Sequence, residues 1–462
     1  MMWLLLSCAR SNPPDPAPAA CIEDDTLVDL PPPEVVVLIS VDTVNRHFLG
    51  VHHPDWDVTP RLDALFAEST LLDHVVVPRG LSGPSMATLV TGVYPRTHGV
   101  RVNEEMLDDP VSADTPTLGE RFVAAGYHAY GFSANQCYLL DGTMQVDCTW
   151  ADPTLDQAEG DAILVTGFLE ALDARPVDEP FFLWIHFMDP HDPYTAREPW
   201  YTEFHPEAYD GPFSEASEDE IAAMMRGDVP YTDADRAHMD AVYASQLKAT
   251  DVYIGQLLDG LATRERLDDA VVAFGIDHGD ELAQRNTYFY HGCSPYGGVI
   301  DVSYAIHAPG RVPMGKVVSA RVPSVDFAPT LVDLAGLEWS GAGEGHTLLP
   351  DLVGCVEPDR AAYFERGRET AGIVVDGYKY FLDPNAGYSS CKHFSAADPF
   401  PNAAQELYDL AADPLELDNL LREEPELAAD LRRRVCAWVL DGPWGVGDAY
   451  ASENVLVEAC ER

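Results

Sequence analysis

Residues 82–99 read Ser-Gly-Pro-Ser-Met-Ala-Thr-Leu-Val-Thr-Gly-Val-Tyr-Pro-Arg-Thr-His-Gly. This stretch predicts a short helix that begins at Ser82, because Pro84 suits the first helical turn. Gly92 suits the end of the helix, and Met86 falls on its apolar face. At the start of a helix, backbone N–H groups and the helix dipole favour an anion such as sulfate or phosphate. The plainer interpretation is that Ser82 only caps the helix.

Around this helix, continuous apolar runs alternate with segments of helical periodicity. Such runs are typical of parallel strands that are buried on both faces. The expected strands are 35–41, 127–132, 181–188 and 270–276. The expected helices are 61–69, 117–126, 163–172 and 239–261. This alternation predicts an α/β fold with a doubly wound, mostly parallel sheet.

The character of the sequence changes after Gly345. The short runs 361–364, 372–375 and 378–382, with a turn at Asp376-Gly377, predict an antiparallel meander, and 426–439 predicts a closing helix. We therefore expect a leader and Pro-rich tether over 1–33, a catalytic domain over 34–345 and a small C-terminal α+β subdomain over 346–462. The acidic, Pro-rich segment 195–235 is expected to be a loop over the site.

The chain is strongly acidic, with 28 Lys and Arg against 77 Asp and Glu and a formal net charge of −49. A field of this sign repels nucleic acids and other polyanions, which argues against nucleic acid as a partner. The charge suits a salty habitat, where it is screened, as well as an ordinary acidic exported protein.

The N-terminus contains Leu5-Leu6-Ser7-Cys8, which resembles a bacterial lipoprotein cleavage box with Cys8 as the lipidated residue. The apolar run is too short to span a bilayer. Because no basic segment precedes it, either the chain starts further upstream or the match is chance. The expectation from the box is an exported bacterial lipoprotein, in the periplasm or outer membrane, attached to the membrane through Cys8.

The nine cysteines give a second indication of export. If Cys8 carries lipid, an even number remains, which suits disulfides in an oxidising compartment. Cys137–Cys148 and Cys436–Cys460 lie closest in sequence and are the expected pairs. The alternative is a set of free, buried thiols.

Polar residues follow three of the expected strands at the point where each strand ends. Asp42-Thr43 follows 35–41, Asp189-Pro-His191 follows 181–188, and Asp277-His278 follows 270–276. Parallel strands end at one edge of their sheet, so these side chains are expected to meet there. Carboxylate oxygens together with an imidazole suit a divalent cation. Any one of them alone would more often be a solvated acid or a structural histidine, so the prediction depends on their joint placement.

Taken together, these segments resemble the sulfatase family. Its nucleophile segment has the pattern Cys or Ser-x-Pro-x-Arg, followed by Thr-Gly-x-Tyr-Pro. Ser82 stands at the position that sulfatases convert to formylglycine, and Met86 stands where the pattern has Arg. Further segments that resemble motifs of the family are 37–43, 125–127, 189–194, 277–279, 291–298, 406–410, 413–414 and 419–420.

The resemblance implies an alkaline-phosphatase-like fold and a metal-dependent ester hydrolase. It implies one divalent metal, with Ca²⁺ expected first and Mg²⁺, Mn²⁺ or Zn²⁺ as alternatives. The implied metal residues are Asp42, Thr43, Asp277 and His278, with the Ser82 oxygen beside them. His191 and His291 are implied to hold the anionic group of the substrate or its leaving oxygen. The substrate is expected to be an anionic ester of a small molecule or glycan.

The departures from the family pattern leave three functions open. The first is hydrolysis of a sulfate ester by Ser82, either as formylglycine or as unmodified serine. The second is a phosphoesterase or phosphoethanolamine-type transferase that uses unmodified Ser82, since a serine ester has no second hydroxyl with which to expel sulfate. The third is a non-catalytic, sulfatase-like binding protein. Arg79 is a candidate for the cation that is missing at position 86.

Overall fold

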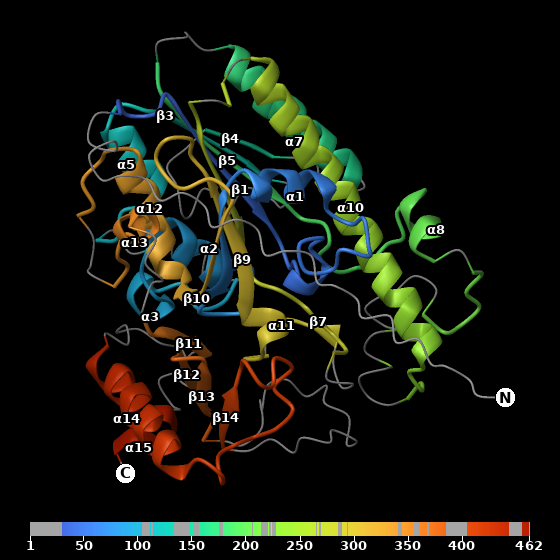
Figure 1. Ribbon diagram of the computed structural model, residues 1–462, viewed down its shortest axis with the longest axis vertical. Helices are drawn as coiled ribbons and strands as arrows, with labels where there is room; N and C mark the ends of the chain where they lie inside the picture. Colours follow the sequence, from blue (N-terminus) through green and yellow to red (C-terminus); the bar gives the residue numbers. More distant parts are fainter. Residues whose placement is uncertain are drawn as a thin grey trace, which may run out of the picture.

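The computed structural model describes residues 30–103, 111, 114–133, 147–150, 157–174, 179–205, 207–213, 220, 223, 228–264, 266–267, 269–284, 289–292, 294–340, 344–354, 360–366, 369–384, 404–442 and 455–461. A large sheet lies at its centre, with strands in the order β10-β2-β9-β6-β1-β5-β3-β4 (Figure 1). Its strands are β1 (Val35–Val41), β2 (Thr70–Val76), β3 (His128–Ser133), β4 (Asp147–Trp150), β5 (Phe181–Phe187), β6 (Val271–Ile276), β9 (Asp301–His307) and β10 (Lys316–Pro323). All neighbours are parallel except β9, which runs antiparallel to β2 and β6.

Helices cover both faces of this sheet (Figure 1). One face carries α1 (Pro60–Ala67), α7 (Gln157–Asp173) and α10 (Asp233–Thr263), and the other carries α2 (Ser82–Thr91), α5 (Leu118–Ala124) and α12 (Phe327–Leu334). Short helices α3 (Pro95–His98), α8 (Trp200–Phe204), α11 (Gly297–Ile300) and α13 (Leu349–Val353) and the small sheet of β7 (Glu281–Leu282) and β8 (Phe289–Tyr290) complete this part. The predicted doubly wound, mostly parallel α/β fold is thereby confirmed.

The segment expected to be one loop over 195–235 departs from the prediction, because it contains α8 and the start of α10. Thr232 caps α10 with a reciprocal pair of hydrogen bonds to Asp235, which lets the helix begin before its apolar periodicity does. Tyr201 on α8 lies against α10, where its hydroxyl is 2.8 Å from Nδ1 of His238. This part of the segment therefore packs on a helix.

The three strands at the middle of the sheet end level with one another. β1 is buried along its whole length, and its last residue, Val41, pairs with Phe187 of β5 and Ile276 of β6. The residues that follow these strands therefore leave the sheet from the same edge, which we call the carboxyl edge. This register is what brings Asp42 and Asp277 together.

The C-terminal part is built on a second sheet, with antiparallel strands β11 (Ala362–Arg366), β12 (Thr370–Val375), β13 (Tyr378–Leu382) and β14 (Gln405–Asp409). Asp376 and Gly377 form the predicted turn with φ values of 51° and 78°. Two helices, α14 (Pro425–Asp441) and α15 (Val455–Glu461), accompany this sheet (Figure 1). The predicted α+β subdomain is confirmed, whereas the boundaries at 33 and 345 stay predictions.

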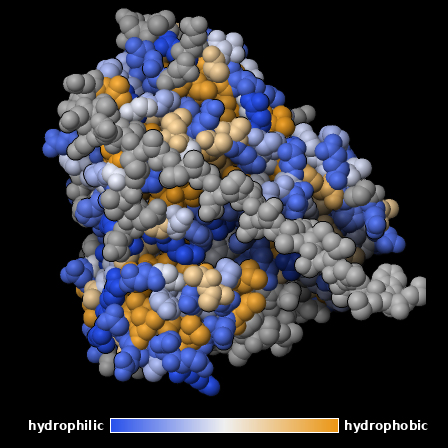
Figure 2. All heavy atoms as spheres, viewed as in Figure 1, coloured by the Kyte–Doolittle hydropathy of each residue, from blue (hydrophilic) through white to orange (hydrophobic). Residues whose placement is uncertain are grey.

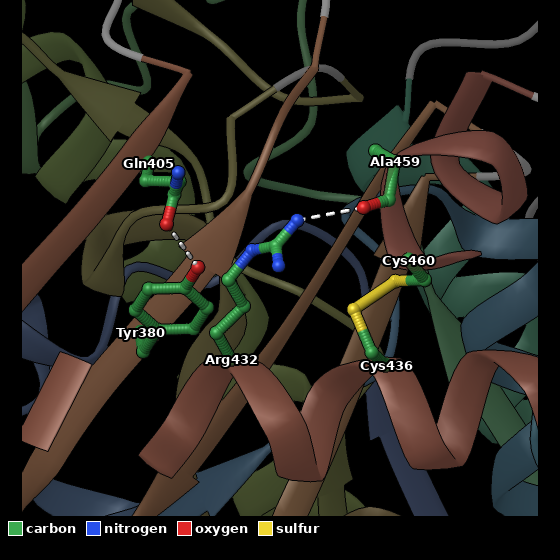
Figure 3. The surroundings of a disulfide bond; sticks show 6 residues. All are labelled: Tyr380, Gln405, Arg432, Cys436, Ala459 and Cys460. Atoms are coloured by element: carbon green, nitrogen blue, oxygen red, sulfur yellow. Dashed lines mark hydrogen bonds between the residues drawn. A yellow bond between two sulfur atoms is a disulfide. The ribbon is translucent and has the colours of Figure 1, made fainter. Parts of the chain in front are cut away.

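A disulfide between Cys436 and Cys460 joins α14 to α15 (Figure 3). Arg432 on α14 reaches across the same gap and donates to the carbonyl of Ala459 at 2.6 Å. This predicted pair is confirmed. The Cys137–Cys148 pair stays a prediction, because Cys137 and the side chain of Cys148 lie outside the described residues, as does Cys8.

The surface carries both hydrophilic and hydrophobic side chains. On the face drawn in Figure 2, hydrophobic residues are interspersed among hydrophilic ones. None of the helices in the described ranges combines the length and the apolar character that crossing a membrane requires.

Candidate active site

Two buried carboxylates stand side by side at the carboxyl edge. Asp42 follows β1 and Asp277 follows β6, and neither side chain is exposed. Thr43 has a φ of 53°, which is uncommon for a β-branched residue, and its N–H donates to Oδ1 of Asp277 at 3.2 Å. The N–H of His278 donates to the same oxygen at 2.6 Å. The backbone therefore fixes one oxygen of Asp277 and turns the other toward Asp42.

The imidazole of His278 points its second nitrogen at these oxygens. Nδ1 lies 2.9 Å from the carbonyl of Gly279, to which it donates, so Nε2 keeps its lone pair. Nε2 lies 3.6 Å from Oδ2 of Asp277 and 3.7 Å from Oδ1 of Asp42. One ligand atom from each of these three residues, the first ligand group, falls within 4.8 Å of the others.

The first ligand group has the properties of a cation site. Among the described residues, Oδ1 of Asp42 and Oδ2 of Asp277 have no hydrogen-bond partner, although both atoms are buried. Orphaned buried carboxylate oxygens are costly unless a cation satisfies them. Together with the lone pair of Nε2 of His278, they form a mixed oxygen and nitrogen donor set that fits a divalent metal.

The pKa values of the group agree with this picture. Burial, reinforced by the negative charge of Asp42, raises the pKa of Asp277 well above its usual range. Burial alone would also raise the pKa of Asp42, but the charge of His191 and contacts with His186 and His278 outweigh it and lower that pKa. Burial lowers the pKa of His278 to about 4, so it is a neutral donor at physiological pH. A cation bound between the two carboxyl groups would favour the charged form of both.

Ser82 begins α2, as the sequence predicts, and the helix ends at Gly92 in the left-handed conformation with a φ of 67°. The Ser82 hydroxyl donates to Oδ2 of Asp42 at 3.2 Å and lies 3.4 Å from Nε2 of His278. Only 3% of Ser82 is exposed. Met86, on the same helix, is fully buried in the core. The structure therefore brings the serine to the first ligand group and leaves position 86 to packing.

The two other predicted histidines lie next to the first ligand group. The ring centres of His191 and His291 are 5.0 Å apart, and that of His291 is 4.8 Å from that of His278. Burial would lower the pKa of His191, but the negative charge of Asp42 outweighs it and raises that pKa, whereas burial lowers the pKa of His291 to about 4. The two imidazoles that face the site therefore have pKa values shifted in opposite directions, that of His191 up and that of His291 down.

The roles of two further predicted residues stay predictions. Thr43 donates its backbone N–H to Asp277, and its buried hydroxyl oxygen has no hydrogen-bond partner within the described ranges. Arg79 lines a small cavity together with Glu365 and Thr370 of the C-terminal subdomain. Its role as a substitute for the missing Arg stays a prediction.

Four residues of the site were not foreseen. Asn103 accepts a hydrogen bond from the N–H of Gly83 at 2.8 Å, at the start of α2. The other three form a buried chain behind Asp42: Nε1 of Trp184 donates to Oγ of Ser40 at 2.7 Å, and Oγ of Ser40 lies 3.0 Å from Nδ1 of His186. Nε2 of His186 is 3.6 Å from Oδ2 of Asp42. The one available signal was a polar residue inside each of two apolar strands, since Ser40 and His186 are register partners.

The mostly parallel sheet with helices on both faces is an alkaline-phosphatase-like fold, and Ser82 lies at its carboxyl edge. A family model described as Sulfatase matches residues 34–337. The chain belongs to the sulfatase family. This confirms the resemblance and the predicted class of enzyme, a sulfatase-family ester hydrolase, a family that generally binds a divalent metal.

Similar proteins span nearly the same length. An arylsulfatase of Clostridium perfringens is 24% identical, over 92% of this chain and 97% of the relative. A choline-sulfatase of Rhizobium meliloti is 28% identical, over 92% and 91%. Among solved structures, the phosphonate monoester hydrolase of Agrobacterium radiobacter has a TM-score of 0.67 at 20% identity, covering 88% of this chain and 95% of the other. A protein solved with its substrate D-glucosamine-2-N,6-O-disulfate has a TM-score of 0.71 at 18% identity, covering 92% and 100%.

Proposed function

We propose that this protein hydrolyses a sulfate ester with Ser82 as the nucleophile and a divalent cation held by the first ligand group. The observation that carries the proposal is the position of the Ser82 hydroxyl, 3.2 Å from Asp42 and 3.4 Å from Nε2 of His278 in a buried site. A nucleophile within reach of such groups can be deprotonated and held in line with the ester. Family membership supports sulfate as the group transferred.

Each residue has a part in the proposed reaction. When bound, the cation would stabilise negative charge on the Ser82 oxygen and on the ester. Asp42 accepts the hydrogen bond of the Ser82 hydroxyl and so orients it. His191 and His291 stand where they would hold the anionic group or give a proton to the leaving oxygen. Attack by Ser82 joins its oxygen to sulfur and releases the alcohol.

The second half of the reaction depends on the state of Ser82. As formylglycine hydrate, its remaining hydroxyl loses a proton and expels sulfate. As plain serine, it needs a water molecule to attack the sulfur, so that Oγ leaves with a proton and sulfate is released. Ca²⁺ is our first proposal for the metal because carboxylate and hydroxyl oxygens dominate the donors, and the nitrogen of His278 makes Mg²⁺, Mn²⁺ and Zn²⁺ the alternatives.

Phosphate ester cleavage is the second candidate. The observation in its favour is that Met86, at the position of the family's Arg, is fully buried and packs in the core. A serine that is not converted to formylglycine is better suited to phosphoryl transfer, where water can resolve the ester. For either reaction we propose a small-molecule or glycan ester as substrate. The phosphonate monoester hydrolase supports only the fold, and export as a lipoprotein through Cys8 stays a prediction.

Mass spectrometry of the peptide spanning residues 79–96 tests the state of Ser82. A loss of two hydrogen atoms from Ser82 supports formylglycine, and the unmodified mass counts against it. Turnover of an aryl sulfate and the matching aryl phosphate, with and without chelator, then ranks the two reactions.

Ser82→Ala should abolish turnover of the preferred substrate, while Ser85→Ala, an equally buried serine one turn along α2, serves as the matched control. Full activity in Ser82→Ala would overturn the nucleophile. Stoichiometric metal binding without turnover of either substrate would support the non-catalytic alternative.

A further inference from the structure

A cavity of about 460 Å³ lies between the main sheet and the C-terminal subdomain, and we call it the junction cavity. One wall contains residues of β2, β9 and β10, and the other contains residues of β12, β13 and the segment that follows β14. The volume falls in the range of sites for small molecules. The lining includes neither Ser82 nor any member of the first ligand group, so the cavity is separate from the candidate active site.

Two arginines that line the junction cavity each have an N–H without an acceptor. Nε of Arg46 and Nε of Arg321 are buried, and neither has a hydrogen-bond partner among the described residues. Arg46 uses its Nη2 to donate to Oδ1 of Asp73 at 2.9 Å. Nε of Arg321 lies 3.6 Å from Oδ2 of Asp301, beyond hydrogen-bond distance. Because a buried donor without an acceptor is costly, both arginines need a further partner.

The acidic residues of the cavity already have partners of their own. Both oxygens of Asp301 lie within hydrogen-bond distance of Nδ1 of His74, at 2.9 and 3.0 Å. In the other wall, Glu416 accepts from Lys379 and from the N–H of Gly297. The acceptor for the two arginines therefore comes from outside the chain, either as water or as an anion.

The electrostatic field in the cavity favours an anion over water. Burial would raise the pKa of Asp301, but its hydrogen bond with His74 and the charges of the two arginines outweigh this and lower that pKa to about 2. Burial lowers the pKa of His47, which also lines the cavity, to about 4, and the charge of Arg46 adds to this shift. A buried acid whose pKa falls lies in a positive field. In a chain with a net charge of −49, such a cavity attracts an anion that the rest of the surface repels.

We propose that the junction cavity binds a tetrahedral oxyanion, a sulfate or phosphate group, between Arg46 and Arg321. Guanidinium groups direct their N–H donors at the oxygens of such anions and keep their charge at physiological pH. The apolar part of the lining, which includes Val76, Val374 and Leu410, can contact a carbon body, so the group is either a free ion or part of a small ester. Because the two walls belong to different units, the bound anion would join the subdomain to the main sheet. This site does not depend on the reaction proposed for Ser82.

Thermal unfolding tests the site in the full-length Ser82→Ala chain, stripped with chelator so that added esters are not turned over. Sulfate and phosphate should raise the midpoint of unfolding more than chloride at the same ionic strength, because a ligand of the folded state stabilises it. Adding Arg321→Gln should weaken the apparent affinity about 10- to 100-fold, as expected for a lost hydrogen bond to a charged group. Arg266→Gln is the matched control and should leave the affinity unchanged. Arg266 is paired with Glu34, and its side chain is 17% exposed against 19% for Arg321.

Isothermal calorimetry of the same proteins distinguishes the two sources of the anion. Glucose 6-sulfate or glucose 6-phosphate that binds more tightly than the free ions would identify a small ester, and equal affinities would identify the free ion. Arg321→Lys, which keeps the charge without the planar fork, should retain part of the affinity. Near-ultraviolet circular dichroism confirms that each variant is folded.

Two results would overturn the proposal. Sulfate and phosphate could stabilise the chain no more than chloride does, or they could bind Arg321→Gln as tightly as the parent protein. In the first case the junction cavity holds water only, and in the second the anion binds elsewhere. With Ser82 intact, Arg321→Gln should turn over an aryl ester at the wild-type rate, and a loss of turnover would make the cavity part of the candidate active site.

Discussion

The carboxyl edge of the main sheet and the C-terminal subdomain both bury charged side chains, yet they satisfy them in opposite ways. In the subdomain, Lys379 and Glu416 form a closed pair: both oxygens of Glu416 lie 2.8 to 3.0 Å from Nζ of Lys379, and Oε1 also accepts from the N–H of Gly297. At the carboxyl edge, Asp42 and Asp277 face each other with one oxygen of each lacking a hydrogen-bond partner among the described residues. The first arrangement is complete within the chain, whereas the second leaves two buried oxygens that we propose a cation satisfies.

Asp277→Asn tests whether the carboxyl edge needs a cation, and it has the largest expected effect. The substitution removes a ligand charge while keeping the shape, so we expect turnover to fall about 10⁴-fold, within the range found when a residue acting as part of a catalytic unit is removed. Without metal the variant should be at least as stable as the wild type, because it ends the repulsion between two buried carboxyl groups. Thermal unfolding with and without added metal measures this difference. If metal stabilised Asp277→Asn as strongly as wild type, the first ligand group would be wrong.

Lys379→Met tests the closed ion pair of the C-terminal subdomain. Glu416 would keep its buried charge without a cationic partner, which costs about 3–5 kcal/mol of unfolding free energy. The double variant Lys379→Met with Glu416→Gln should recover much of this loss, since the uncompensated charge is gone. Denaturant unfolding measures both values, and metal affinity of the folded proteins should stay unchanged. Equal stabilities for the single and double variants would contradict the account of a closed pair.

The disulfide shows that the subdomain also contains its own covalent constraint. Replacing Cys436 and Cys460 together by serine should cost about 3 kcal/mol, the value expected for a loop of this length, because the cross-link restricts the unfolded chain. Turnover at a temperature where the variant remains folded should match the wild type. Denaturant unfolding of the oxidised and reduced wild type gives an independent measure of the same difference. A loss of metal binding would mean that the subdomain shapes the carboxyl edge more closely than we infer.

The sequence predicted the strands that position the site better than it predicted the groups that support the site. Apolar runs as uniform as 35–41 leave little choice of structure, and the acids that follow them mark the edge where strands end. β9 and β14 were missed because neither has a clear hydrophobic periodicity. Polar residues interrupt β9, and β14 is only five residues long. Asn103 accepts a hydrogen bond from Gly83, 20 residues earlier in the chain. A contact over such a separation depends on the folded chain and cannot be read from local sequence.

Ser40 and His186 illustrate the same limit inside the site. Each is a polar residue in an otherwise apolar strand, and their relation becomes visible only when the register pairs them. Trp184 can only donate, so the Ser40 hydroxyl accepts from it and is left to donate to Nδ1 of His186. Nε2–H of His186 is thereby aimed at Asp42. We infer that His186 positions Asp42 rather than contacting the substrate.

His186→Ala has the smallest expected effect, because it removes a residue that positions the proposed metal ligand Asp42 and leaves Asp42 itself in place. We expect metal affinity to weaken 10- to 100-fold, the usual consequence of losing the partner of a metal ligand. At saturating metal the Michaelis constant should change little, while the metal concentration needed for half-maximal activity rises. Ser40→Ala removes the group that sets the tautomer of His186 and should give a shift of the same kind but smaller. A variant that unfolds more easily while binding metal as tightly as wild type would make His186 a packing residue, and the carboxyl edge would then depend on its two acids and His278 alone.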